Sequence, residues 1–242
     1  MTDELPPARK RMVKPPMGGT EEGRGKPARL KTAKMRTPSS QAWLSRQVND
    51  PFAAKARAHG YRSRAAYKLT EIDDRLHLLK PGMRVIDLGA APGGWTQVAV
   101  ERGVVNIVGV DLLPVDPISP AQIIEMDFTD PACGPLLIEM LGGPPDIVLS
   151  DMAPNTVGHR KTDHLRIMGL IEIGVDFAIS VLKPGGAFIA KAFQGGETSL
   201  VIANLKHHFT EVKNMKPKAS RADSSETYLV ATGFKGRSGE RR

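Results

Sequence analysis

The strongest constraint on the fold is a regular alternation of short apolar runs with longer helical patterns. The apolar runs have the length and composition of strands and fall at 84–88, 106–112, 122–126, 146–150, 187–192 and 228–233, with a weaker one at 211–215. Helical patterns fall at 63–79, 94–102, 163–182 and 198–208. Strands that alternate with helices form mostly parallel sheets with helices on both faces. We therefore expect an α/β fold whose ligand site lies at the carboxyl ends of the strands.

Charge divides the chain into an acidic middle and basic ends. Residues 76–205 hold 8 Lys/Arg and 14 Asp/Glu, whereas residues 1–40 hold 10 and 4, and residues 206–242 hold 9 and 4. The first forty residues also contain six Pro and few large apolar side chains. We expect a disordered basic N-terminal arm over 1–40, a folded domain over 41–234 and a basic tail over 235–242. Basic margins around an acidic body are typical of nucleic-acid binding, with solvated tails as the alternative.

Composition argues against membrane, export and disulfide classes. The N-terminus lacks an apolar core, so we expect no signal peptide, and the most apolar long stretch is interrupted by Glu172 and Asp176. The single cysteine, Cys133, excludes an internal disulfide framework and a cysteine-based zinc cluster, and we expect it to be inert in a Pro/Gly loop. We expect a cytoplasmic monomer that is not bound to a membrane and holds no metal.

The sharpest local motif joins a predicted strand to a helix through a turn of small residues, Val85-Ile86-Asp87-Leu88-Gly89-Ala90-Ala91-Pro92-Gly93-Gly94-Trp95. It matches neither the glycine pattern of dinucleotide-binding folds nor that of phosphate-binding loops, which favours a nucleoside over a pyrophosphate. Asp111 ends the second strand, where a carboxylate accepts hydrogen bonds from ribose hydroxyls. Asp127 follows the third strand and could accept from an adenine amino group. A helix cap or loop acid is the alternative for each.

The turn, together with Asp-Leu-Leu-Pro at 111–114 and Asp-Phe at 127–128, resembles the S-adenosylmethionine-dependent RNA ribose 2′-O-methyltransferases over residues 50–234. Within that family the resemblance is strongest to the bacterial heat-shock enzymes that modify 23S ribosomal RNA. It implies a Rossmann-like S-adenosylmethionine-dependent methyltransferase fold, with a mostly parallel seven-stranded sheet flanked by helices. It also implies a cofactor site lined by Gly93, Trp95, Asp111, Asp127 and Asp151.

The same family carries a Lys–Asp–Lys–Glu catalytic tetrad, and each member matches a short motif here, at Lys68, Asp151, Lys191 and Glu226. A lysine inside an apolar strand must be paired, reach water or lose its proton. We assign Lys191 as the acceptor of the ribose 2′-hydroxyl proton, with a solvent-reaching strand-end lysine as the alternative. Lys68 would disfavour the charged form of Lys191 and stabilise the developing alkoxide. Asp151 would orient Lys191, and Glu226 would position Lys68 or the ribose.

Basic residues border the predicted tetrad in two clusters. The first is Arg57, Arg62, Arg64 and Lys68, next to Tyr61 and Tyr67, and the second is Lys213, Lys216, Lys218 and Arg221. The first could offer phosphate contacts and base stacking from one helix face, or be a solvated face whose tyrosines pack inward. By the resemblance, the substrate is a uridine in the A-loop of 23S rRNA within the large ribosomal subunit. The alternatives are a tRNA or mRNA-cap 2′-O-methyltransferase and a noncatalytic ribosome-assembly factor.

Overall fold

The computed structural model describes residues 49–154, 160–195, 198–221 and 224–237. The chain separates by contact density into residues 1–45 and 46–242, and all described residues belong to the second unit. The strands are β1 (Arg84–Leu88), β2 (Asn106–Asp111), β3 (Gln122–Glu125), β4 (Ile147–Ser150), β5 (Ala187–Phe193), β6 (Phe209–Met215) and β7 (Glu226–Phe234). The helices are α2 (Pro51–Ala58), α3 (Ala66–Leu76), α4 (Gly94–Glu101), α5 (Cys133–Leu141), α6 (Arg160–Val181) and α7 (Thr198–His208). The predicted arm over 1–40 and part of the predicted tail, 238–242, lie outside the described residues.

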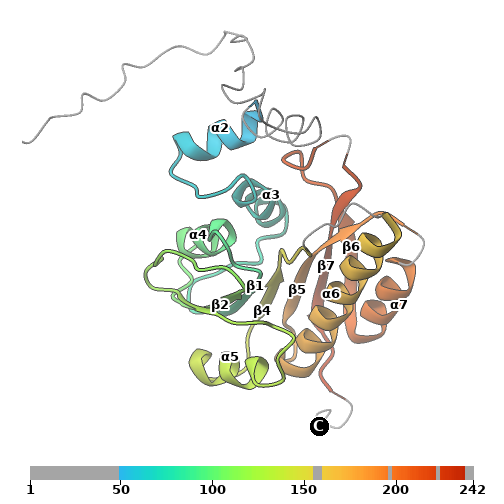
Figure 1. Cartoon of the computed structure of the whole chain (residues 1–242). Coiled ribbons are helices and arrows are strands. Elements are labelled where there is room, and N and C mark those ends of the chain that lie inside the picture. Colours follow the sequence, from blue (N-terminus) through green and yellow to red (C-terminus); the bar gives the residue numbers. More distant parts are fainter. Residues whose placement is uncertain (1–48, 155–159, 196–197, 222–223, 238–242) are drawn as a thin grey trace, which may run out of the picture. The chain divides into compact units, whose positions relative to one another are not determined.

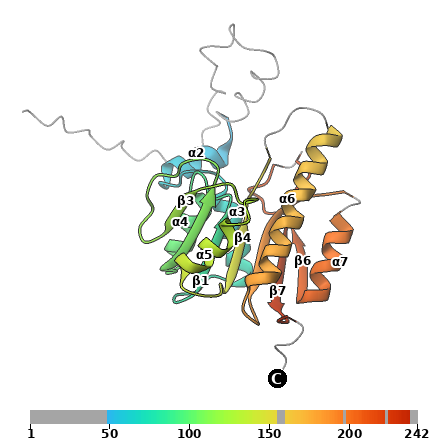
Figure 2. The ribbon, with the colours of Figure 1, turned by 60° about the horizontal axis from the view of Figure 1, so that its bottom comes forward.

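All seven strands belong to one sheet with the order β3-β2-β1-β4-β5-β7-β6. Strands β3, β2, β1, β4 and β5 are parallel, and β7 runs antiparallel to both β5 and β6. Helices cover both faces of this sheet (Figures 1 and 2). The predicted fold class, a mostly parallel seven-stranded sheet flanked by helices, is confirmed. Each predicted strand and helix begins and ends within three residues of the observed one.

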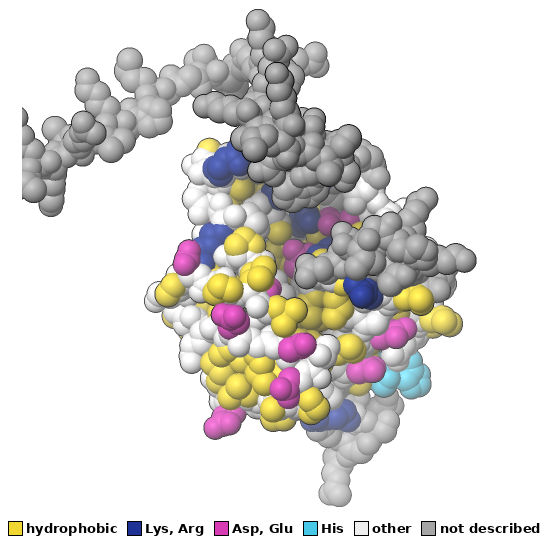
Figure 3. All heavy atoms as spheres, in the orientation of Figure 1, with side chains coloured by type: hydrophobic (Ala, Val, Ile, Leu, Met, Phe, Trp, Pro, Cys, Tyr) yellow, Lys and Arg dark blue, Asp and Glu magenta, His cyan; other side chains and the backbone are white. Residues whose placement is uncertain are grey.

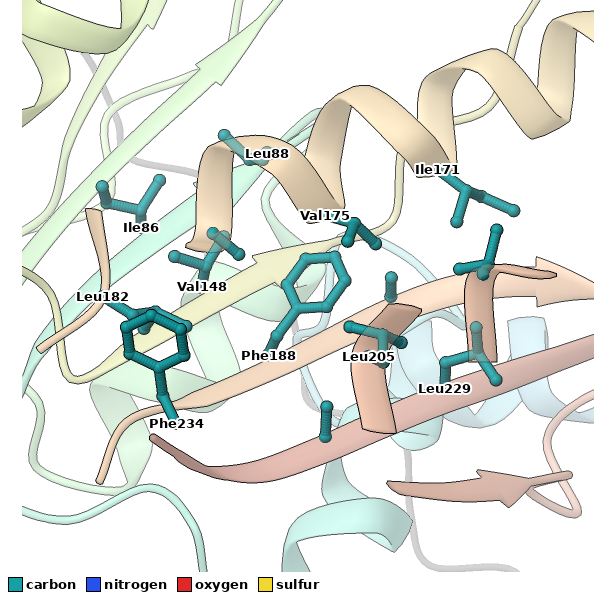
Figure 4. Packing of buried hydrophobic residues seen from close by; sticks show 14 of the residues in the cluster. Ile86, Leu88, Val148, Ile171, Val175, Leu182, Phe188, Leu205, Leu229 and Phe234 are labelled. Atoms are coloured by element: carbon teal, nitrogen blue, oxygen red, sulfur yellow. The ribbon is translucent and has the colours of Figure 1, made fainter. Parts of the chain in front are cut away.

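Each face of the sheet has its own apolar core. Phe188 and Leu229 point toward α5, α6 and α7, and Figure 4 shows Phe188 directed at Val175 of α6. Ile189 and Val230 belong to the opposite core, against α3 and α4. Successive side chains of a strand alternate between faces. The same alternation therefore places Lys191, two residues after Ile189, and Glu226 of β7 on the face that α3 covers.

Two observed helices, α2 and α5, were not predicted from the sequence. Helix α2 has only eight residues and buries only Ala56, so its hydrophobic period is too short to detect. Helix α5 begins Cys133-Gly134-Pro135, which looks like a loop, but Pro is tolerated in the first turn because its missing N–H has no intrahelical partner there. The prediction that Cys133 lies in a loop is wrong: it starts α5 and is fully buried. None of the described helices is long and apolar enough to cross a membrane.

Candidate active site

Lys191 and Asp151 form one half of the candidate catalytic group. Lys191 lies near the end of β5, and Asp151 follows the last residue of the neighbouring strand β4. The Lys191 Nζ donates to the Asp151 backbone carbonyl at 2.6 Å and lies 3.1 Å from its carboxylate Oδ1. Two contacts to one residue hold the ammonium group in place. The requirement that a lysine in an apolar strand be paired is therefore met by Asp151.

Lys68 and Glu226 form the other half. Lys68 comes from α3 and Glu226 opens β7, and the Lys68 Nζ lies 2.8 Å from Glu226 Oε1 and 3.0 Å from Oε2. The hydroxyl of Ser220 donates to Glu226 Oε1 at 2.8 Å. Ser220 is buried in the segment that leads into β7. Glu226 is thus fixed from two sides, and it holds Lys68 in turn.

Tyr228 connects the two halves. It pairs with Lys191 in the register of β5 and β7, and its hydroxyl donates to Asp151 Oδ1 at 3.3 Å. The Lys68 Nζ lies 5.5 Å from the centroid of its ring, within the range of a cation–π contact. The sequence analysis missed Tyr228. Its position two residues after Glu226 on the same strand face is the pattern that could have identified it.

Electrostatics show that the two halves act on each other. Burial raises the pKa of Glu226, but the charge of Lys68, the hydrogen bonds from Lys68 and Ser220, and the charge of Lys191 outweigh burial, and the net pKa is lowered. Burial, followed by the negative charges of Asp151 and Glu226, raises the pKa of Tyr228 well above its ordinary value. Glu226 therefore stays ionised and Tyr228 stays a neutral donor near neutral pH. The structure brings the four predicted tetrad residues into one coupled group.

A pocket of about 100 Å³ lies beside this group, at the carboxyl ends of β1, β2 and β4. Its lining includes Gly89, Asp111, Asp127 and the two residues after Asp151, Met152 and Ala153. The volume holds only part of a ligand of nucleoside size, so such a ligand must extend beyond it. Because Asp151 immediately precedes two lining residues, this pocket adjoins the candidate catalytic group.

The turn after β1 brings the backbone close to this pocket. Gly89 has a φ of +76°, and a Cβ there would lie 2.8 Å from the backbone nitrogen of Met152. Only glycine fits both the left-handed conformation and the close approach. The Asp111 Oδ2 accepts from the N–H of Ala91 at 2.9 Å, which ties the turn to the end of β2. This hydrogen bond therefore holds the turn and the predicted ribose-binding carboxylate together.

Asp127 lines the same pocket and is exposed. Its Oδ1 accepts from the backbone N–H and the hydroxyl of Thr129, at 2.8 and 2.7 Å. These bonds lower the pKa of Asp127, the backbone one most, so it is an ionised acceptor. The structure thus places two acceptors, Asp111 and Asp127, in one pocket with apolar walls, which suits the hydroxyls and flat ring of a nucleoside.

Neither Gly93 nor Trp95 belongs to the residues that line this pocket, and their contact with the cofactor stays a prediction. The indole ring of Trp95 is buried, donates from Nε1 to the Ala65 carbonyl at 2.9 Å, and packs on Tyr228 with ring centroids 5.7 Å apart. A Cβ on Gly93 would lie 2.3 Å from Cδ1 of Ile118, so the loop after β2 packs directly on it. In this structure Trp95 therefore packs against Tyr228 beside the tetrad, and Gly93 lies against the loop after β2.

Asp87 of β1 is a titratable group that the sequence analysis did not assign. It is fully buried, and its Oδ2 accepts from the Thr96 hydroxyl at 2.6 Å, while Oδ1 has no hydrogen-bond partner within the described part of the chain. Burial, and then the charges of Asp151 and Asp111, raise its pKa to about 7 despite the hydrogen bond from Thr96. The carboxyl group of Asp87 therefore interacts electrostatically with Asp111 and Asp151.

A larger cavity of about 1070 Å³ lies between α5 and α6, and its lining includes no member of the tetrad. Figure 3 shows a group of hydrophobic side chains on this part of the surface, where α5 lies in Figure 1. The larger cavity is lined by several acidic residues and by the apolar side chains of Phe128, Pro135, Ile138, Phe177 and Val181. No tetrad residue lines either pocket, but Met152 and Ala153, which follow Asp151 directly, line the smaller one together with Gly89, Asp111 and Asp127. The smaller pocket is therefore the candidate ligand site.

The first predicted basic cluster does not form one helix face. Arg57 lies on α2, the chain turns at Gly60 with a φ of +77°, and Arg62 and Arg64 precede α3. Arg64 bonds to Asp50 and to the Ala219 carbonyl.

The tyrosines of this segment also have partners inside the protein. Tyr61 donates to Glu101, the Tyr67 hydroxyl lies 2.9 Å from His59 Nδ1, and the two rings meet edge to face. Much of the predicted RNA-binding face is thus used to fasten the segment to the domain.

Comparisons with known proteins agree with this geometry. A family model described as FtsJ-like methyltransferase matches residues 61–234. The ribosomal RNA large subunit methyltransferase E of Caulobacter sp. strain K31 is 75% identical over 226 residues, which is 93% of this chain and 100% of that protein. The protein of the same name from Caulobacter vibrioides is 70% identical over the same lengths. A ribosomal RNA methyltransferase structure from Plasmodium falciparum is 33% identical, with a TM-score of 0.65, and the match covers 73% of this chain and 100% of that one.

Proposed function

Because the chain belongs to the FtsJ-like methyltransferase family, we propose that it transfers a methyl group from S-adenosylmethionine to ribosomal RNA of the large subunit. The acceptor in this proposal is the ribose 2′-hydroxyl of a uridine in the A-loop of 23S rRNA. Relatives at 75% and 70% identity carry the name of a large-subunit RNA methyltransferase, which supports the substrate class.

One observation carries the proposal: two buried lysines and two carboxylates lie in one group beside a pocket that holds part of a nucleoside-sized ligand. Lys191 and Lys68 are only 9% and 8% exposed, and each has a carboxylate partner. A binding module gains nothing from burying two cations in this way, because their desolvation is costly. An enzyme that must accept a proton and stabilise an alkoxide needs both.

The residues have distinct roles in this reaction. The cofactor supplies a methyl group on a sulfonium sulfur, which leaves as a thioether. Lys191 first releases its ammonium proton to solvent; the neutral Nζ then takes the proton that the 2′-hydroxyl loses, while the carbonyl and carboxylate of Asp151 hold the amine in place. Lys68, held by Glu226, lies on the same sheet face and stabilises negative charge on the 2′-oxygen. Alignment of hydroxyl and methyl group provides the remainder of the acceleration.

The residues of the pocket fit S-adenosylmethionine. Asp111 offers acceptor capacity for the ribose hydroxyls, and Asp127 for the adenine amino group. Val110, Met126 and Met152 provide apolar contact for the ring. A site of this kind, with apolar walls and few polar groups, gives orientation as well as affinity.

Transfer of labelled methyl groups from S-adenosylmethionine tests the proposal. The acceptors are large ribosomal subunits that lack the 2′-O-methyl group, free 23S rRNA and tRNA, and mass spectrometry locates the product. Lys191→Ala is compared with Lys206→Ala, which removes an exposed lysine of α7. We expect a 23S ribose to be methylated by the wild type and the Lys206 variant, and the Lys191 variant to lose at least about 100-fold in rate.

Other results would change the reading in defined ways. Methylation of tRNA alone would retain the chemistry and replace the substrate. Methyl transfer to a base nitrogen or carbon would overturn the assignment of the ribose hydroxyl. Binding of subunits without transfer to any RNA would support the noncatalytic assembly factor.

A further inference from the structure

The guanidinium group of Arg62 lies against the backbone of two loops that border the cofactor pocket. Its Nη1 donates to the carbonyls of Asp116 at 2.6 Å and Pro92 at 3.3 Å, and its Nη2 donates to the carbonyl of Pro117 at 2.9 Å. Pro92 belongs to the turn between β1 and α4, and residues 116–117 belong to the loop between β2 and β3. One side chain therefore joins the tips of both loops.

These two loops start from the residues that form the pocket. The first begins at Gly89 and the second at Asp111 and Leu112, all of which line it. The loops are tied at their base by the bond between Ala91 and Asp111. Beyond that tie, residues 112–121 have no helix or strand, and Leu112 is 64% exposed. The contacts of Arg62 hold this irregular segment where Ile118 reaches Gly93.

Arg62 is itself held firmly at its backbone. Its N–H donates to Gln97 Oε1 at 2.8 Å, and Gln97 Nε2 donates to the Gly60 carbonyl at 3.0 Å. The segment 60–62 is thus fixed to α4, and it continues into α3, which carries Lys68. The same chain segment therefore reaches both the cofactor loops and the catalytic group.

We propose that Arg62 is a positioning residue for the cofactor: it holds the loops 89–93 and 112–121 in the conformation that binds S-adenosylmethionine. This inference rests on the proposed function. It differs from the phosphate-binding role that the sequence suggested, because three of the guanidinium hydrogen bonds go to protein carbonyls. Loops that are ordered before binding spare the ligand the entropic cost of ordering them. Loss of Arg62 should therefore weaken cofactor binding.

Binding of S-adenosylhomocysteine, measured by titration calorimetry without RNA, tests the proposal. We expect Arg62→Ala to raise the Kd about tenfold, since charge-assisted hydrogen bonds are lost, and Arg62→Lys to fall between this variant and the wild type. Arg102→Ala is the matched control. Arg102 also fixes helix ends, through Asp73 and Asp74, but it touches neither loop in any described contact. It should lower the melting temperature and leave the Kd unchanged.

Hydrogen exchange supplies a readout that a merely structural role would not move. Arg62→Ala should accelerate amide exchange in residues 112–121 selectively, and Arg102→Ala should not. RNA binding tests the alternative role of Arg62 as a phosphate contact. If Arg62 contacted an RNA phosphate, Arg62→Ala would reduce the slope of log affinity against log salt concentration by about one, whereas we expect no change.

An unchanged cofactor Kd for Arg62→Ala, together with unchanged exchange over 112–121, would overturn the inference and leave the proposed function intact. If the wild type bound no S-adenosylhomocysteine, the proposed function itself would be wrong.

Discussion

The Nζ of Lys191 lies 2.6 Å from the backbone carbonyl of Asp151 and 3.1 Å from its carboxylate. Asp151 is followed by Met152 and Ala153, both of which line the proposed cofactor pocket. The position of the proposed proton acceptor is therefore set by the same short segment that shapes the site proposed for the methyl donor. In such a site, small changes in alignment have large effects on rate.

Replacement of Lys191 by arginine tests whether charge alone is enough. Arginine keeps the cation but does not act as a proton acceptor in proteins. We expect Lys191→Arg to lower the single-turnover methylation rate at least about 100-fold, with cofactor binding unchanged. Lys206→Arg on the surface of α7 is the control. A rate near that of the wild type would show that Lys191 acts only through its charge.

The ion pair of Lys68 and Glu226 should show strong coupling in a double-mutant cycle of unfolding. Lys68→Met and Glu226→Gln each leave one partner buried without its counter-charge. The destabilisation by the two single variants should therefore add up to more than the destabilisation by the double variant. We expect a coupling energy of about 1–3 kcal/mol from urea denaturation. The exposed pair of Lys213 and Glu211, at 3.0 Å, is the control and should couple by less than about 1 kcal/mol. Equal coupling in the two pairs would contradict the role of burial.

The buried carboxyl group of Asp87 should make stability depend on pH. Its folded-state pKa of about 7 lies above the ordinary value, so the folded protein binds this proton more tightly than the unfolded chain does. The contribution of the Asp87 proton to the free energy of unfolding is fully present below about pH 4. It is lost as the pH rises from about 4 to about 7, by roughly 4 kcal/mol at most.

Asp87→Asn removes this titration, and Asn can still accept from Thr96 through its amide oxygen. The unfolding free energy of the variant relative to the wild type should therefore rise between about pH 4 and pH 7 and be constant above about pH 8. Asp130→Asn, at an exposed position after β3, is the control. A difference that is the same at every pH would show that the pKa of Asp87 is not raised in the folded protein.

Alanine substitutions at two glycines with similar φ angles distinguish the cost of backbone strain from the cost of steric crowding. Gly89 and Gly142 have φ values of +76° and +72°, but only at Gly89 would a Cβ meet the backbone of Met152, at 2.8 Å, whereas nothing lies within 4 Å at Gly142. Gly142→Ala should cost about 1–2 kcal/mol of stability from strain alone. Gly89→Ala should cost more, and it should also weaken S-adenosylhomocysteine binding at least about tenfold. Equal effects on cofactor binding would place the pocket elsewhere.

Much of the site was predictable because it depends on local pattern. The alternation of strands and helices determined the sheet, and strand ends collected Asp111, Asp127 and Asp151 at one edge. The order of the short motifs identified Lys68, Asp151, Lys191 and Glu226 through their resemblance to a family. Period-two alternation within β5 and β7 then determines that Lys191 and Glu226 share a face. These features follow from residues that are near one another in sequence or from strands of known direction.

Tertiary structure alone decided what each side chain touches. The sequence suggested that Arg62 and Arg64 contact phosphates. In the folded chain Arg62 donates to the carbonyls of a distant loop, and Arg64 donates to the carboxylate of Asp50. Trp95 was predicted to contact the cofactor, and in the fold its ring packs beneath Tyr228. A guanidinium or an indole takes its hydrogen-bond partners from whichever groups the fold places within reach. Sequence determines which groups need partners, and the three-dimensional path of the loops determines which partners they find.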